Sequence, residues 1–227
     1  MTNEHRPGSC PLCSSGEAAF FHRDSRREYL RCDDCGLVFV PSPYFLSPEA
    51  EKDCYDYHQN NPADVGYRRF LARLARPLIE RLSPGARGLD FGSGPGPTLS
   101  LMLAEAGFPT AIYDPFYKPN AVWDDDYDFV TASEVVEHLH RPMSDLDRIW
   151  SALKPGGCFG IMTKRVLDVT AFAKWHYKND PTHVVFFSEE TFIWLAQKWT
   201  AELEFVGDDV VFLQKPKLAS TGSERLL

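Results

Sequence analysis

The chain has 227 residues, of which 44% are hydrophobic and 25% charged, and its formal net charge is −8 at pH 7. These values are typical of a soluble globular protein and exclude collagen-like, coiled-coil and disordered chains. No stretch approaches the roughly 18 apolar residues of a membrane span, and the polar N-terminus indicates no signal peptide, so we expect a cytoplasmic protein with no membrane partner. The negative charge argues against a surface built to bind nucleic-acid phosphates.

Four of the six cysteines lie near the N-terminus, as two Cys-x-x-Cys pairs: Cys10, Cys13, Cys32 and Cys35. This spacing matches a site in which four thiolates hold one zinc ion. Two disulfides or free thiols are the alternative, and an iron site would have the same geometry. Cys54 and Cys158 stand alone, and we expect them to be packing residues.

The segment around the cysteines predicts a small zinc ribbon over residues 1–45. Residues 18–30 mix aromatic and charged side chains, as an antiparallel hairpin does, and residues 37–40 form a short apolar strand. A basic run lies in this segment: Arg23, Arg26, Arg27 and Arg31. These arginines form either a solvated face or a patch for an anionic partner.

A helical connector is expected over residues 46–87. Residues 49–64 show no clear period, whereas apolar residues recur at helical spacing over residues 67–82. Pro77 lies inside this pattern, so we expect a kink or a break into two helices. Another face of the helix carries Arg69, Arg73 and Arg76.

Strands and helices alternate in the third segment, residues 88–214. The predicted strands are 87–91, 110–113, 129–132, 158–163, 203–206 and 210–213, and the predicted helices are 98–106, 142–153 and 189–198. A turn is expected over 154–157, and 207–209 indicates a hairpin. This order predicts an α/β fold with a doubly wound, mostly parallel, Rossmann-like sheet and a terminal antiparallel strand. Residues 215–227 are expected to form a flexible tail.

The strongest functional signal is the loop from Asp90 to Gly96, which follows a predicted strand and precedes a helix. Glycines permit a sharp turn and a close approach of the backbone to a ligand. A carboxylate at Asp90 would repel a pyrophosphate but would suit an ammonium group. Asp114 ends the next strand, where it can accept both hydroxyls of a ribose. A glycine-rich turn without a ligand, with Asp114 as a cap, is the alternative.

These motifs, in this order, resemble a class I S-adenosylmethionine-dependent methyltransferase. The resemblance covers residues 86–214 and rests on the runs 89–96, 127–130, 134–139 and 153–157 together with Asp114. It implies a cofactor site formed by Asp90, Gly92, Ser93, Gly94 and Gly96 around the methionine part, Asp114 at the ribose, and Ala132, Ser133 and Glu134 along the cleft. The cysteine pairs resemble those of a subgroup that carries a zinc ribbon before this fold.

One segment departs from the family pattern. Only 13 residues separate Asp114 from Asp128, where members of the family have a helix and a full strand. A remnant strand is expected at 121–123, and Trp123 or Asp124 is the candidate for contact with the adenine. The acidic run 124–126 is otherwise a solvated loop.

The segment 175–184 is dense in polar and aromatic groups, and the resemblance implies that it faces the substrate. His183 is the candidate general base or hydrogen-bond partner of the substrate, and Tyr177 and His176 are further catalytic candidates. His183 could instead be structural, and His138 is expected to be structural.

The sequence therefore predicts an enzyme that transfers the methyl group of S-adenosylmethionine by in-line displacement to a small-molecule acceptor, such as a sugar or a secondary metabolite. An RNA or protein methyltransferase that uses the zinc ribbon for recognition is the first alternative. A binding module with a degenerate cofactor site is the second. The acidic excess falls within residues 88–227 and favours the small molecule.

Overall fold

The computed structural model describes residues 9–57, 60–120, 123 and 126–217. Its strands are β1 (Ala18–Arg23), β2 (Glu28–Cys32), β3 (Val38–Phe39), β4 (Gly88–Phe91), β5 (Thr110–Tyr113), β6 (Tyr127–Ser133), β7 (Leu153–Met162), β8 (Val185–Phe186), β9 (Glu202–Val206) and β10 (Val210–Gln214). Its helices are α1 (Pro48–Asp56), α2 (Val65–Ile79), α3 (Thr98–Glu105), α4 (Pro142–Ala152), α5 (Val169–Lys174) and α6 (Glu189–Trp199), with the short 3-10 turns η1 (Ser42–Tyr44), η2 (Val136–His138) and η3 (His176–Asn179).

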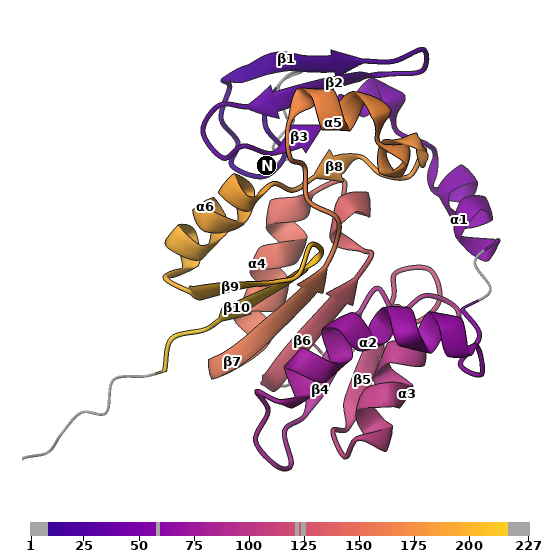
Figure 1. The fold of residues 1–227 in the computed structure, drawn as a ribbon, viewed down its shortest axis with the longest axis vertical. Helices are drawn as coiled ribbons and strands as arrows, with labels where there is room; N and C mark the ends of the chain where they lie inside the picture. The colour runs from indigo at the N-terminus through magenta and orange to yellow at the C-terminus, as the bar shows by residue number, and fades with distance from the viewer. Residues whose placement is uncertain (1–8, 58–59, 121–122, 124–125, 218–227) are drawn as a thin grey trace, which may run out of the picture.

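The larger sheet has six strands in the order β5-β4-β6-β7-β10-β9 (Figure 1). β4 runs parallel to β5 and to β6, and β6 runs parallel to β7. β10 is antiparallel to both of its neighbours, β7 and β9. The expected α/β sheet, mostly parallel and closed by an antiparallel hairpin, is confirmed.

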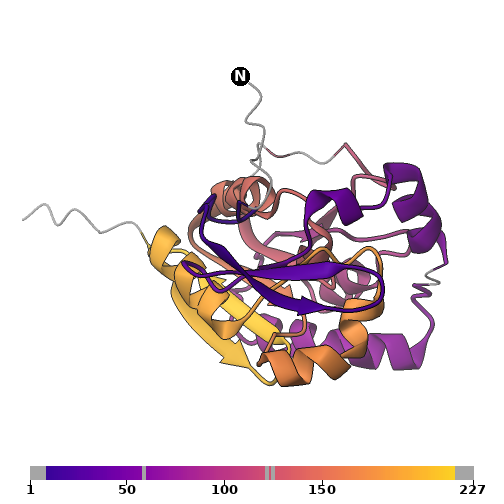
Figure 2. The ribbon, with the colours of Figure 1, turned by 90° about the horizontal axis from the view of Figure 1, so that it is seen from above.

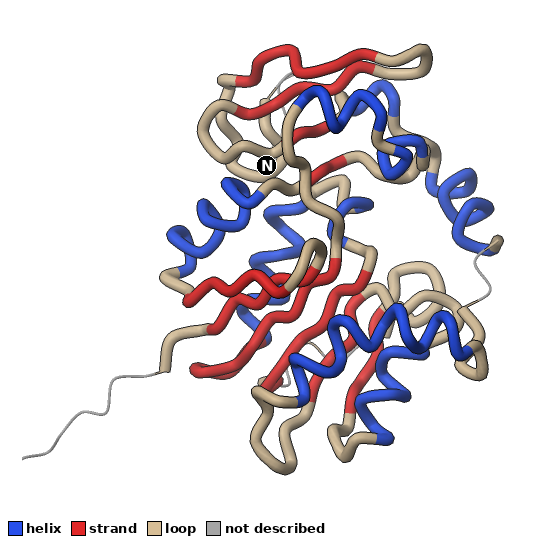
Figure 3. Tube along the Cα trace, in the orientation of Figure 1, coloured by secondary structure: helices blue, strands red, loops and turns tan. Residues whose placement is uncertain are grey.

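Helices cover both faces of this sheet (Figure 3). Alternate residues of a strand point to opposite faces, and along β6 Phe129 joins a core with α2 and α3, whereas Val130 joins a core with α4 and α6. In α2 the apolar stripe of Leu71, Leu74 and Leu78 is buried in the first of these cores. The periodicity that predicted α2 therefore reflects its packing on the sheet.

The smaller sheet has the order β1-β2-β3-β8 and lies beyond the carboxyl ends of β6 and β7, at the top of Figure 1. Its β1–β2 hairpin was predicted, but its fourth strand was not. In β8, Phe186 pairs with Val38, and Val185 pairs with Phe39. Viewed from above, the hairpin extends across the molecule (Figure 2). The N-terminal residues and the segment after β7 thus share one sheet.

Several local expectations differ from the structure. Residues 48–56 form α1, whose first turn is capped by the Ser47 hydroxyl. α2 continues through Pro77 to Ile79, so the helix does not break there. The turn expected over 154–157 is instead the irregular beginning of β7, where Gly156 has a φ of 77° and Leu153 pairs with Tyr127.

Three expectations involve residues outside the described part of the chain: most of the remnant strand at 121–123, the adenine contact of Asp124, and most of the flexible tail. Within the described ranges, no helix combines the length and the apolar character needed to span a bilayer.

Candidate functional site

A cavity of about 650 Å³ opens where β4, β5 and β6 end. The carboxyl ends of parallel strands are where open α/β sheets bind their ligands. We call the part lined by residues 90–95 and Asp114 the glycine-loop end. The part that we call the histidine end is lined by Glu51, Tyr55, His138, His140, Asp180 and His183.

The glycine loop owes its shape to two left-handed residues. Gly92 and Gly94 have φ of 74° and 65°, a conformation that favours glycine. A Cβ on Gly92 would also lie 2.5 Å from the Val135 side chain. Gly96 does not line the cavity: a Cβ there would lie 2.0 Å from the carbonyl oxygen of Asn60. Gly96 therefore lets the segment before α2 pack on the loop.

Asp90 lies at the base of this loop and is 3% exposed. Its Oδ1 accepts a hydrogen bond of 2.8 Å from the Thr131 hydroxyl. Burial raises the pKa of Asp90 to about 7, because desolvation disfavours the ionised form. A cationic group bound beside Asp90 would restore its ionised form.

Asp114 ties the end of β5 to the glycine loop. Its Oδ2 accepts from the Gly94 N–H at 2.9 Å, and its Oδ1 accepts from the N–H groups of Phe116 and Tyr117 at 2.9 and 3.0 Å. A carboxylate offers about four acceptor positions, so three are used within the chain and one remains for a ligand hydroxyl.

Three polar atoms along the cavity wall are buried with no hydrogen-bond partner in the described part of the chain: Ser93 Oγ, Ser133 Oγ and Glu134 Oε1. Buried polar atoms are normally paired. Glu134 also has a φ of 53°, uncommon for a residue other than glycine and characteristic of functional sites. Burial raises its pKa to about 7. A polar ligand in the cavity would satisfy these groups.

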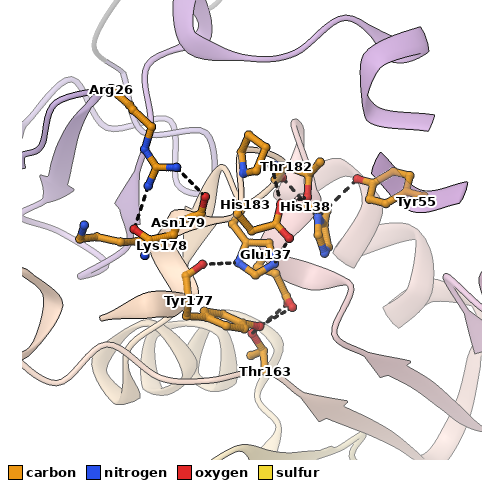
Figure 4. Close-up of polar contacts among 12 residues, drawn as sticks. Arg26, Tyr55, Glu137, His138, Thr163, Tyr177, Lys178, Asn179, Thr182 and His183 are labelled. Carbon is orange, nitrogen blue, oxygen red and sulfur yellow. Dashed lines mark hydrogen bonds and ion pairs between the residues drawn. The ribbon is translucent and has the colours of Figure 1, made fainter. Parts of the chain in front are cut away.

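The histidine end is assembled from three separate segments. α1 contributes Glu51, whose Oε1 lies 2.7 Å from His140 Nε2, and Tyr55, whose hydroxyl lies 3.3 Å from His138 Nδ1. The same nitrogen lies 3.2 Å from the carbonyl oxygen of Thr182 (Figure 4). α1 therefore forms one wall of the histidine end, near the loop that carries His183.

His183 has its imidazole fixed by the backbone. Its Nδ1 lies 2.8 Å from the carbonyl oxygen of Tyr177, which can only accept, so Nδ1 carries the hydrogen and Nε2 bears the lone pair in the neutral ring. Nε2 lies 3.9 Å from Asp180 Oδ2, and the ring meets that of His138 edge to face with centroids 4.6 Å apart. This geometry suits a proton acceptor.

A second, fully enclosed polar group lies behind His183. The Tyr177 hydroxyl donates to Glu137 Oε1, and the Thr163 hydroxyl donates to Glu137 Oε2 at 2.9 Å (Figure 4). Glu137 is 0% exposed, and burial raises its pKa to about 8. Tyr177 is buried and does not line the cavity.

A family model described as "Methyltransferase domain" matches residues 67–203. The chain belongs to this family of S-adenosylmethionine-dependent methyltransferases. No curated protein matches the chain.

Solved methyltransferases share the fold. A Burkholderia thailandensis 1,6-didemethyltoxoflavin-N1-methyltransferase, solved with 1,6-didemethyltoxoflavin and S-adenosylhomocysteine, has a TM-score of 0.52 at 16% identity, covering 88% of this chain and 100% of its own. An Archaeoglobus fulgidus S-adenosylmethionine-dependent methyltransferase has a TM-score of 0.50 at 17% identity, covering 65% and 94%. An O-methyltransferase family protein from B. thailandensis has a TM-score of 0.50 at 11% identity, covering 74% and 64%. At these sequence identities, the similarity shows a shared fold and nothing about the substrate.

Not every residue expected at the methyltransferase site lines the cavity. Ala132 lies in the core of the sheet at 0% exposure. Trp123 packs against Tyr113, with ring centroids 4.9 Å apart, and the Arg148 guanidinium lies 3.8 Å from its ring centroid. His176 is exposed, and its Nε2 lies 3.1 Å from Lys164 Nζ. Of the three catalytic candidates, only His183 reaches the cavity.

The sequence did not predict that Glu51 and Tyr55 line the cavity of this methyltransferase, because residues 49–64 show no apolar period that would indicate a helix. The signal that could have found α1 is its N-terminus, where Ser47 precedes Pro48, the usual order of an N-cap and a first helical residue.

The four N-terminal cysteines come together at the smaller sheet. All four Sγ atoms lie within 4.8 Å of one another. The pairs are Cys10 with Cys35 at 3.6 Å and Cys13 with Cys32 at 3.4 Å, and none forms a disulfide. We call this group the cysteine cluster.

Proposed function

We propose that this methyltransferase transfers a methyl group from S-adenosylmethionine to a small-molecule acceptor bound at the histidine end. The observation that carries the proposal is one cavity with two ends: the glycine-loop end offers carboxylates and the Ser93 hydroxyl, which has no partner among the described residues, and the histidine end offers an oriented base.

The glycine-loop end fits the cofactor. Asp90 suits the cationic methionine part, Asp114 keeps one acceptor position for a ribose hydroxyl, and Ser93 Oγ is buried without a partner in the described chain. When bound, the cofactor supplies an electrophilic methyl carbon on a sulfonium. The protein's task is then to hold the acceptor in line and to exclude water.

The charges on the cavity wall favour a small acceptor without phosphate groups. The described residues that line it include five carboxylates and no lysine or arginine: Glu51, Asp90, Asp114, Glu134 and Asp180. A phosphate would be repelled there, because none of the described lining residues is a lysine or an arginine that could offset its charge.

Two groups of arginines supported the RNA or protein alternative, and the four of the β1–β2 hairpin have partners within the chain. Arg23 pairs with Glu28 and Arg31 with Glu190, while Arg26 binds Asn179. Arg27 is buried. Four arginines of the hairpin are thus committed to internal contacts, which supports the small-molecule acceptor.

His183 is proposed as the base that takes the proton of an acceptor hydroxyl or amine. Its Nδ1–H is held by the Tyr177 carbonyl, so Nε2 can receive a proton, and Asp180 would stabilise the resulting imidazolium. Tyr177 serves this role through its backbone oxygen and through its bond to Glu137. His176 receives no role, because its side chain is exposed and bonded to Lys164.

The cysteine cluster is proposed to hold a structural zinc ion. Zinc bound tetrahedrally to four thiolates at about 2.3 Å places the sulfurs about 3.8 Å apart, close to the two Sγ distances. Three of the four side chains are fully buried, Cys10, Cys32 and Cys35. A site closed by four protein ligands organises structure and leaves no open position for catalysis.

The proposed function is tested by calorimetry with S-adenosylhomocysteine. We expect the unmodified protein to bind it, Asp114→Ala to weaken binding by about ten-fold or more, and the control Asp208→Ala, an exposed acid of the β9–β10 turn, to leave it unchanged. No binding by the unmodified protein, or equal binding by Asp114→Ala, contradicts the assigned cofactor site.

The acceptor class is tested on the protein saturated with S-adenosylhomocysteine. Three phenols of similar size differ in charge: tyramine, 4-ethylphenol and 3-(4-hydroxyphenyl)propionate. We expect the anionic phenol to bind most weakly. Glu51→Gln should reduce the difference in affinity between the anionic phenol and the other two. Preferential binding of the anion contradicts the proposed acceptor class.

A further inference from the structure

The turn of the β1–β2 hairpin lies against the loop that carries His183. Arg27, in this turn, is 7% exposed, and its guanidinium donates to three backbone carbonyls of that loop. NH2 bonds the carbonyl oxygens of Lys178 and Asp180 at 2.6 and 2.7 Å, and NH1 bonds that of Pro181 at 3.1 Å. Because a guanidinium presents its donors in a rigid fork, one side chain fixes the path of residues 178–181.

Arg27 is itself held in place within the hairpin. Its Nε donates to the Tyr29 hydroxyl at 3.0 Å, which donates to Asp24 Oδ2 at 3.0 Å. Lys178 Nζ also reaches Asp24 Oδ2, at 3.2 Å. Burial opposes the ionisation of Asp24, but hydrogen bonds from the Arg26 and Arg27 N–H groups and from Lys178 outweigh it and hold the pKa below its usual range. The buried cations therefore face an ionised carboxylate.

A neighbouring arginine adds contacts at the surface. Arg26 NH1 donates to the carbonyl oxygen of Asn179 at 2.9 Å, and its NH2 donates to Asn179 Oδ1 at 2.8 Å (Figure 4). Arg26 is exposed, unlike Arg27. Arg26 and Arg27 of the hairpin thus form hydrogen bonds with every residue from 178 to 181.

The loop of residues 178–181, held by these hydrogen bonds, sets the position of His183. The carbonyl of Asp180, held by Arg27, also accepts the His183 N–H at 3.3 Å. The carbonyl of Tyr177, one residue before this segment, forms the hydrogen bond that fixes His183 Nδ1. After His183, the Val184 carbonyl accepts the Val40 N–H at 2.8 Å. His183 therefore lies between two attachments of its loop to the smaller sheet.

We propose that Arg27 is a positioning residue for His183, and that the β1–β2 hairpin supports the loop of the acceptor site from outside the cavity. The inference rests on the proposed role of His183. Loss of Arg27 frees the loop and allows His183 to change its tautomer, while the glycine-loop end, formed at the ends of β4 and β5, keeps its affinity for S-adenosylhomocysteine.

The test uses the full chain and three readouts. Nitrogen-15 NMR of the imidazoles reports the tautomer of His183, assigned by its loss in His183→Gln. Hydrogen exchange reports the amides of residues 178–180, 182 and 183, and calorimetry reports S-adenosylhomocysteine binding. The variant is Arg27→Ala, and the matched control is Arg23→Ala, whose side chain is exposed on the same hairpin and pairs with Glu28.

In Arg27→Ala we expect the Nδ1–H signature of His183 to be replaced by a tautomer average, and exchange of the loop amides to rise by about ten-fold or more. Binding of S-adenosylhomocysteine stays unchanged, and Arg23→Ala behaves as the unmodified protein. Unchanged His183 signals and unchanged exchange in a folded Arg27→Ala overturn the proposal.

If Arg27→Ala does not fold, Arg26→Ala is the deciding variant. We expect exchange of the same amides to rise by a smaller factor in Arg26→Ala, and the absence of any rise overturns the proposal. If the unmodified protein fails to bind S-adenosylhomocysteine, the proposed function fails, while the His183 signals of Arg27→Ala still decide the role of Arg27.

Discussion

The two ends of the cavity are built in different ways. The glycine-loop end comes from one loop and the ends of neighbouring strands, and Asp114 closes it with three short hydrogen bonds to backbone N–H groups. The histidine end draws on α1, on the segment after β6, and on a loop gripped by the N-terminal hairpin. The cofactor half of the site is therefore local, whereas the acceptor half depends on contacts between distant parts of the chain.

This difference predicts that the two halves respond separately to change. The largest effect is expected from Cys32→Ser, which removes one thiolate of the cysteine cluster at the end of β2. A structural zinc site contributes on the order of 10 kcal/mol to folding of its module. We expect the variant to lose the metal, which elemental analysis measures. We also expect the hairpin and the His183 loop to become less ordered, which hydrogen exchange measures.

The control for that variant is Cys54→Ser, which lies outside the cluster on α1. Binding of S-adenosylhomocysteine is expected to stay within about three-fold in both variants, since separated sites perturb one another little. Less than about half an equivalent of metal in the unmodified protein, purified under reducing conditions, contradicts the zinc site. A collapse of cofactor binding in Cys32→Ser contradicts the independence of the two ends.

A smaller effect, confined to one residue, sharpens the same comparison. For His183→Ala we expect turnover of a phenolic probe that the protein methylates to fall about 10²- to 10⁴-fold, because the acceptor proton loses its base. The affinity for S-adenosylhomocysteine should not change. The control is His176→Ala, which alters an exposed imidazole seven residues earlier. Equal turnover by His183→Ala and the unmodified protein removes His183 from the mechanism.

The contrast between the two ends also explains what could be predicted from the sequence. The six-stranded sheet, the glycine loop and Asp114 follow from apolar period and from turn chemistry, which act between residues close in the chain. His183 was found because its segment is unusually polar and aromatic, and because of the family resemblance. Gly96 was placed at the cofactor, but what it accommodates is the backbone of Asn60.

The contacts that complete the histidine end have no local signal. β8 has only two residues, and it is a strand because Val38 and Phe39 pair with it. Arg27 belongs to a basic run that reads equally well as a solvated face, and only the fold brings it to carbonyls about 150 positions later. Glu51 and Tyr55 face the cavity because α1 packs beside it, which the weak period of residues 49–64 does not reveal.

The smallest expected effect concerns Glu137, behind His183. Its pKa rises from a usual 4.5 to about 8 in the folded protein, chiefly because it is buried, with Glu134 adding to the shift. The folded state therefore holds a proton that the unfolded chain releases above about pH 4.5. The stability contributed by this proton is complete below that pH and is lost as the pH rises towards about 8, by at most about 1.4 kcal/mol per pH unit.

We expect the thermal unfolding temperature of the cofactor-free protein to fall between pH 6 and pH 8, and Glu137→Gln to reduce that slope. Glu134→Gln is the necessary comparison, because burial also raises the pKa of Glu134, to about 7, and its charge acts on Glu137. An undiminished slope in Glu137→Gln would show that Glu137 is ionised in the folded protein. The Tyr177 and Thr163 hydroxyls would then be stabilising a buried negative charge directly behind His183, and the imidazolium of His183 would be more stable than the present assignment implies.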